Sequence, residues 1–147
     1  MDILTIDAGV IVQQVNTLGV MGAGLAKQIA DKWPVVARRY KEQYKNHSLG
    51  SVLLVNVSPG VMVANVFAQN TIGRRGLHTS YEALYNGLQY LSYLLPPHQP
   101  QVYIPQGLGC GLGGGHWGVV ESIIARTLPD AMIVSLSRAE PYPVMAP

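Results

Sequence analysis

The order of apolar and polar positions along the chain predicts a strand followed by two helices near its start. Residues 10–15 form a largely apolar, β-branched run with apolar side chains on both faces, which is typical of a strand inside a sheet. From Gly24 the apolar positions fall at helical spacing until Pro34, which ends that helix. We expect a second, more polar helix over residues 35–45, and a short extended segment over residues 3–6.

The middle of the chain predicts a hairpin and then a loop. Residues 51–55 and 61–67 have the composition of strands, and the turn-forming Ser-Pro-Gly sequence at 58–60 favours an antiparallel pair. Residues 69–78 show no periodicity, so we expect them to form a loop.

Helix and strand continue to alternate in the second half. The sequence Thr-Ser-Tyr-Glu at residues 79–82 has the pattern of a capping box, in which Thr79 would cap a helix that Pro96 ends. Beyond it we expect a strand at 101–104, a helix at 117–128, a strand at 132–136 and an irregular, proline-rich tail at 141–147. The pattern predicts the α/β class, as a three-layer α/β/α sandwich with a mixed, mostly parallel sheet, in one domain over residues 1–140.

Two glycine-rich segments each follow a predicted strand and precede a helix. Residues 16–26 hold three glycines in six positions, and residues 105–117 hold six in nine. Glycine lets the backbone approach a ligand closely, and the first amides of a helix have no internal partner. Since ligands bind at the carboxyl edge of such sheets, two turns of this kind could clamp a diphosphate.

Composition and charge exclude several classes of protein. The net charge of +2 is too small to indicate a general nucleic-acid partner. A single cysteine, Cys110, permits no internal disulfide and favours a reducing, cytoplasmic location. Neither a signal peptide nor an apolar stretch of membrane length is present, so we expect no membrane partner. The histidines show no metal-ligand spacing, and we expect neither a metal nor a cofactor.

Other phosphate-binding classes fit less well. Gly109, Gly111 and Gly114 match the dinucleotide fingerprint, but only one predicted strand follows them, which disfavours a nicotinamide-dependent oxidoreductase. No Gly-Lys-Ser or Gly-Lys-Thr occurs, which excludes a P-loop nucleotidase.

Several motifs, taken in order, resemble the macro domain, the ADP-ribose-binding module. The resemblance spans residues 2 to about 137 and is closest to the branch of ADP-ribose 1''-phosphate phosphatases, ADP-ribosyl-glutamate hydrolases and antitoxins that remove ADP-ribose from DNA. It is carried by Asp2-Ile3-Leu4, the run from Val10 through Asn16-Thr17 to Gly24-Leu25-Ala26, Trp33-Pro34, Leu49-Gly50-Ser51-Val52 and the run from Ile104 to Trp117.

The resemblance implies a site for each part of ADP-ribose. Asp2 would accept a hydrogen bond from the adenine amino group, with the backbone of Ile3 nearby, and Asn16 would bond a hydroxyl of the distal ribose. The first glycine-rich turn would line the distal ribose and diphosphate, and the second would supply phosphate-binding amides. The implied ligand-binding residues of these turns are Gly19, Val20, Met21, Gly22, Gly24, Gly109, Cys110, Gly111, Leu112, Gly113 and Gly114.

The chain departs from the family pattern in two respects. The family usually has a strand before the segment that residues 1–3 match, so the sheet could be one strand short, with an edge to be covered by another element or a partner. Related hydrolases use a lysine in the loop that matches residues 70–73, and some use an aspartate where Gly113 stands. A route through a lysine imine or an aspartate is therefore not expected.

Hydrolysis would then depend on a positioned water. The candidates are Asn16, to orient sugar or water, and His116 and His78, as general acid or base. The alternatives are a turn-forming asparagine and histidines that cap a helix or lie on the surface.

We expect an ADP-ribose-binding hydrolase that removes the 1''-phosphate or an ADP-ribosyl group. The alternative is a non-catalytic reader of free or conjugated ADP-ribose. Nucleic acid is expected only as an ADP-ribosylated target, although Arg38, Arg39, Arg74 and Arg75 leave direct binding of single strands or poly(ADP-ribose) as a third possibility. We expect a monomer or a weak oligomer.

Overall fold

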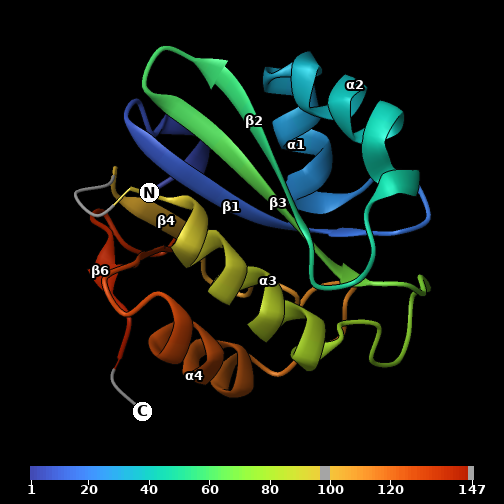
Figure 1. Cartoon of the computed structure of the whole chain (residues 1–147). Coiled ribbons are helices and arrows are strands. Elements are labelled where there is room, and N and C mark those ends of the chain that lie inside the picture. Colours follow the sequence, from blue (N-terminus) through green and yellow to red (C-terminus); the bar gives the residue numbers. More distant parts are fainter. Residues whose placement is uncertain (97–99, 146–147) are drawn as a thin grey trace.

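Strand β1 (Gly9–Asn16) lies at the centre of a six-stranded sheet, in the order β2-β3-β1-β4-β5-β6. The computed structural model describes residues 1–96 and 100–145, and Figure 1 shows helices on both faces of this sheet. The other elements are the 3-10 helices η1 (Ile3–Thr5) and η2 (Tyr44–Asn46), the helices α1 (Gly24–Lys32), α2 (Pro34–Gln43), α3 (Tyr81–Leu94) and α4 (Trp117–Thr127), and the strands β2 (Val52–Ser58), β3 (Val61–Gln69), β4 (Val102–Pro105), β5 (Met132–Val134) and β6 (Tyr142–Pro143).

The centre of the sheet is parallel and its edges are antiparallel. Strand β1 pairs in parallel with β3 and β4, and β4 pairs in parallel with β5. Strand β2 runs antiparallel to β3, as the hairpin prediction required, and β6 runs antiparallel to β5. The prediction of a mixed, mostly parallel sheet is therefore confirmed, and the carboxyl ends of β1, β4 and β5 meet at one edge.

Alternate side chains of β1 supply two apolar cores. Val10 and Val12 pack in the core that includes residues of α3 and α4, whereas Ile11 and Val15 pack in the core that includes residues of α1 and α2. All four are buried, because successive side chains of a strand point to opposite faces. The prediction of a strand covered on both sides, between two helical layers, is confirmed (Figure 1).

The segment over residues 3–6 is not extended, and that prediction was wrong. Residues 3–5 form the 3-10 helix η1, which begins after Asp2. The Asp2 carboxylate accepts a hydrogen bond from the Leu4 amide at 2.9 Å, and the Asp2 carbonyl accepts one from the Thr5 hydroxyl at 2.6 Å. Local bonds of this kind compete with an extended backbone.

The helix cap at α3 falls one residue later than predicted. Ser80 is the N-cap residue, and its hydroxyl accepts a hydrogen bond from the Ala83 amide at 3.1 Å. The Thr79 hydroxyl instead donates to the carbonyl of Gly109 at 2.7 Å. Thr79 therefore ties the start of α3 to the second glycine-rich turn.

The tail is only partly irregular, which corrects the prediction for residues 141–147. Tyr142 and Pro143 form β6, which pairs with Ile133 and Met132 of β5. Tyr142 and Val144 also pack against the core that includes residues of α3 and α4. The tail thus covers the edge of β5, while residues 146–147 lie outside the described residues.

Candidate functional site

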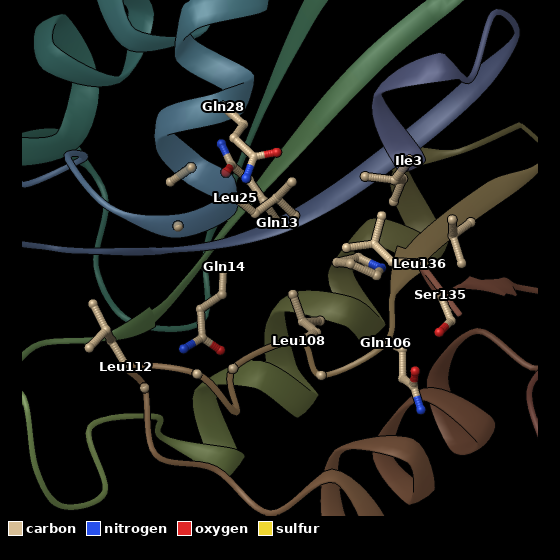
Figure 2. A pocket seen from close by; sticks show the side chains of 18 of the residues that line it. Ile3, Gln13, Gln14, Leu25, Gln28, Gln106, Leu108, Leu112, Ser135 and Leu136 are labelled. Carbon is tan, nitrogen blue, oxygen red and sulfur yellow. The ribbon is translucent and has the colours of Figure 1, made fainter. Parts of the chain in front are cut away.

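A cavity of ≈ 630 Å³ opens at the carboxyl ends of β1, β4 and β5. It draws on segments that are far apart in the sequence but adjacent in the fold, as Figure 2 shows for the side chains that it labels. Its lining residues are 1–3, 13–14, 23–26, 28, 69, 105–109, 111–113 and 134–137.

Both glycine-rich segments reach this cavity. Gly24 lines it from the first segment, at the start of α1, together with the residues beside it. Of the other predicted ligand-binding residues, Asp2, Ile3, Gly109, Gly111, Leu112 and Gly113 line the cavity, and Asn16, Gly19, Val20, Met21, Gly22, Cys110 and Gly114 do not.

The start of α1 presents free backbone amides to the cavity. Its N-cap residue, Ala23, makes no side-chain cap, and the Ala23 carbonyl accepts a hydrogen bond from the Lys27 amide. Among the described residues, no acceptor takes a hydrogen bond from the amides of Gly24, Leu25 or Ala26. A helix start with open amides attracts an anion.

The second glycine-rich segment offers another group of free amides. Its turns are closed by bonds from the Gly114 amide to the Gly111 carbonyl at 3.0 Å and from the Gly115 amide to the Gly109 carbonyl at 2.8 Å. Within the described chain, the amides of residues 111–113 donate to no protein acceptor, and all three residues line the cavity. Successive free amides of this kind form an anion-binding nest.

Glycine is required at some positions of this segment and not at others. A Cβ on Gly113 would stand 2.5 Å from the Thr79 hydroxyl oxygen, and one on Gly114 would stand 2.0 Å from the Gly76 carbonyl oxygen. Around Gly111, in contrast, no heavy atom lies within 4 Å of such a Cβ. An aspartate at position 113 would therefore not fit this packing.

The other end of the cavity combines one carboxylate with apolar surface. Asp2 uses one carboxylate oxygen to cap η1, and its second oxygen is engaged by no described residue. Leu136, which is 84% exposed, lines the same end beside Ser135 and Ser137. This surface suits a planar, apolar group that carries hydrogen-bond donors at its edge.

Asn16 serves its own turn instead of facing the cavity. Its Oδ1 accepts hydrogen bonds from the Leu18 amide at 3.0 Å and the Val20 amide at 3.2 Å, and its Nδ2 donates to the Val20 carbonyl at 2.8 Å. The hydroxyl of the buried Tyr40 lies 2.8 Å from the same Oδ1 and accepts from the Gly19 amide at 3.1 Å. Burial raises the pKa of Tyr40 to about 12.

The two candidate histidines lie outside the cavity. The His78 ring is held by the Thr71 hydroxyl and the Arg75 carbonyl, each at 2.8 Å. His116 is the N-cap residue of α4, and its Nδ1 accepts a hydrogen bond from the Gly118 amide at 3.2 Å. Neither ring lines the cavity. His116 is therefore a helix-capping histidine and His78 a surface histidine, which are the alternatives to a catalytic role.

The surroundings of Cys110 do not favour a nucleophilic role for its thiol. It is half-buried, and its thiol lies 3.3 Å from the Leu108 carbonyl oxygen. Burial raises the pKa of the thiol, which disfavours the nucleophilic thiolate.

Glutamines are the lining residues that sequence reasoning missed. Gln13, Gln14, Gln28, Gln69 and Gln106 all line the cavity. The available signal was the polar Gln13-Gln14 pair within an otherwise apolar strand, since a buried polar residue needs a partner. Across residues 1–96 and 100–145 no metal-binding group of three or more His, Cys, Asp or Glu residues occurs, and no helix there has the length and apolarity to cross a membrane.

The fold of this chain recurs among solved structures. A protein of unknown function from Bacteroides thetaiotaomicron is 29% identical, with a TM-score of 0.81 over 90% of this chain and 92% of that chain. The macrodomain of Mycobacterium tuberculosis DarG is 27% identical, with a TM-score of 0.74 over 97% and 93%. Thermosipho africanus DarTG, solved in complex with ADP-ribose, is 20% identical, with a TM-score of 0.68 over 91% of this chain and 40% of that chain.

The chain therefore has the macro domain fold. No protein-family model matches its sequence, and no curated protein does.

Proposed function

We propose that this chain binds ADP-ribose in the cavity at the carboxyl edge of its sheet. The observation that carries the proposal is the meeting of two groups of unpaired backbone amides in one cavity, from the start of α1 and from residues 111–113. Two anion-binding groups that face one cleft suit a ligand with two linked phosphates. The ADP-ribose complex of the similarly folded Thermosipho protein supports the same ligand class.

The ends of the cavity suit the remaining parts of the ligand. The open carboxylate oxygen of Asp2 would accept from the adenine amino group, and Leu136 would pack against the base. The glutamine-lined part of the cavity would take the distal ribose.

Binding without catalysis is the second candidate, and one observation favours it. Of the described side chains that line the cavity, Asp2 carries the only carboxylate, and none is a histidine, a lysine or a cysteine. General acid or base catalysis needs a proton-transferring group within reach of the reacting atoms, and Asn16, His78 and His116 all bond elsewhere. Hydrolysis of the 1''-phosphate or of an ADP-ribosyl linkage stays a prediction from the resemblance.

Calorimetry with ADP-ribose tests the binding proposal. Gly111→Val places a side chain in open space that borders the cavity, so the fold should persist while the ligand is excluded. We expect binding by the wild type and at least tenfold weaker binding by the variant. Asn86→Val, at an exposed position of α3 outside the cavity, is the matched control and should bind like the wild type. Equal affinities in all three proteins would contradict the proposal.

Phosphate release separates the hydrolase from the reader. The wild type and the cavity-blocking variant Gly111→Val are incubated with ADP-ribose 1''-phosphate, and inorganic phosphate is measured over time. Release by the wild type well above that of Gly111→Val would support a hydrolase. Binding of ADP-ribose without release of phosphate would support the non-catalytic reader.

A further inference from the structure

Two adjacent glutamines at the carboxyl end of β1 carry acceptor atoms that no described residue satisfies. Gln13 is 2% exposed and Gln14 is half-buried, and both line the cavity. Their side chains leave opposite sides of β1, as Figure 2 shows, so the lining of the cavity includes residues from both faces of this strand. The Oε1 atom of each is buried and accepts no hydrogen bond from residues 1–96 or 100–145.

A backbone carbonyl fixes the orientation of the Gln13 amide. The Leu53 carbonyl accepts a hydrogen bond from Asn65 Nδ2 at 3.0 Å, so Asn65 must turn its Oδ1 toward Gln13. That oxygen then requires a donor, which Gln13 Nε2 supplies at 2.7 Å. The remaining group of Gln13 is necessarily its acceptor, Oε1.

The same reasoning fixes the Gln14 amide. Thr79 gives its one hydroxyl proton to the Gly109 carbonyl at 2.7 Å, so it can only accept from Gln14 Nε2, also at 2.7 Å. Gln69 donates from its Nε2 to the Thr71 carbonyl, and its Oε1 therefore accepts from the same Gln14 nitrogen at 3.1 Å. Gln14 Oε1 is therefore left without a donor. It lies close to Gly109, because a Cβ added to Gly109 would stand 2.8 Å from this oxygen.

The two acceptors without a donor belong to residues that line one cavity, and they define the chemistry of a group that would meet them. A buried acceptor without a donor costs free energy, which a ligand that brings a donor recovers. A diphosphate offers only acceptors at neutral pH, whereas a sugar hydroxyl donates. Asn16, to which the resemblance gave the ribose hydroxyl, already accepts from two amides of its own turn.

We propose that Gln13 and Gln14 recognise the distal ribose of the ligand, each accepting a hydrogen bond from a ribose hydroxyl at its Oε1 atom. This inference rests on the proposed binding of ADP-ribose. It makes the glutamine pair the feature that separates ADP-ribose from ADP, which has the same adenosine and diphosphate but no distal ribose.

The test is the ratio of the affinities for ADP-ribose and ADP, measured by calorimetry. Gln14→Met keeps the length of the side chain and removes its acceptor. We expect ADP-ribose to bind about five- to tenfold more weakly, the loss typical of one hydrogen bond, with the ADP affinity unchanged. Gln13→Met should change the same ratio in the same direction.

Thr79→Val is the matched control for an effect through the loop. It breaks the link from Gln14 to the Gly109 carbonyl, while Gln69 Oε1 can still accept from Gln14 Nε2 and hold the amide in the same orientation. If Gln14 acts only by holding the loop, both variants should weaken ADP-ribose and ADP alike, and the inference is overturned. An unchanged ratio in Gln13→Met and Gln14→Met overturns it as well.

Ligand analogues give an answer even if a variant does not fold. ADP-ribose that lacks the 2'' or the 3'' hydroxyl should bind the wild type about five- to tenfold more weakly than ADP-ribose. Equal binding of both deoxy analogues overturns the glutamine assignment while the proposed function stands. No binding of ADP-ribose itself overturns the proposed function, and the glutamine assignment falls with it.

Discussion

The glycines of the second glycine-rich segment have two different roles. Some are required because a side chain would clash with the protein, and others border open space in the cavity. Gly113 has the Thr79 hydroxyl oxygen and the Gly109 carbonyl oxygen within 2.6 Å of the place of a Cβ, whereas Gly111 has no heavy atom within 4 Å. Both residues line the same cavity. Sequence alone gives all these glycines one interpretation, because their surroundings come from a distant loop.

We predict opposite effects of alanine at these two positions. Gly113→Ala should lower the free energy of unfolding by about 2 kcal/mol, because the methyl group overlaps two oxygen atoms. Gly111→Ala should leave that free energy within about 1 kcal/mol of the wild type, since its backbone is not left-handed and the space is open. Urea unfolding of both variants measures the difference. Equal stabilities would contradict the packing described for Gly113.

Tyr40 predicts how the protein responds to alkali. Burial raises its pKa from an ordinary value of 10.0 to about 12, so the unfolded chain loses this proton at a lower pH than the folded chain does. The stabilisation from Tyr40 is therefore complete below about pH 10 and is lost as the pH rises toward about 12. Urea midpoints measured in steps across this range should fall less for Tyr40→Phe than for the wild type. A parallel fall in both proteins would rule out the assignment to Tyr40.

Among the elements, the helices and inner strands follow from local patterns and the sheet edges do not. The helical spacing after Gly24, the turn at Pro59-Gly60 and the apolar run of β1 each specify their element within a few residues. Strand β6 has two residues, one of them proline, and exists only because β5 lies beside it. No local pattern could indicate that pairing.

The contribution of β6 can be measured through Tyr142. Its ring packs against the core that includes residues of α3 and α4, and the Arg138 guanidinium lies 4.0 Å from the ring centroid. We expect Tyr142→Ala to lower the free energy of unfolding by about 1–3 kcal/mol, from lost apolar burial and a lost cation–π contact. Tyr93→Ala, at a ring that is 75% exposed, is the matched control and should cost less than about 1 kcal/mol. Similar losses in both variants would mean that β6 adds little stability.

The candidate site was only partly foreseeable for the same reason. Gly24, Gly109 and residues 111–113 could be predicted, because glycine-rich turns after strands indicate a ligand edge. Asp2 could be predicted only from the resemblance to macro domains. The roles of Asn16, His78 and His116 could not be judged from the sequence, because their hydrogen-bond partners depend on how the loops fold. These partners are Tyr40, Thr71 and Gly118, respectively. The glutamine pair became meaningful only when Asn65 and Thr79 fixed its orientation.

At the scale of the whole molecule, two apolar cores hold one ligand edge in place. The core on the side of α1 and α2 positions the start of α1, and the core on the side of α3 and α4 supports Leu108 at the base of the second segment. Strand β1 contributes to both cores and ends at the cavity between them. The two groups of free amides therefore belong to opposite layers and meet because the central strand is shared.

A crystal structure of the complex with ADP-ribose would show whether both groups of free amides bind the ligand. We expect the diphosphate to lie within hydrogen-bonding distance of the amides of residues 111–113 and of the first amides of α1. The Gln13 and Gln14 amide oxygens should then face the distal ribose. A diphosphate that contacts only one of the two amide groups, or that binds outside the cavity at the ends of β1, β4 and β5, would overturn the proposed binding by two groups of amides.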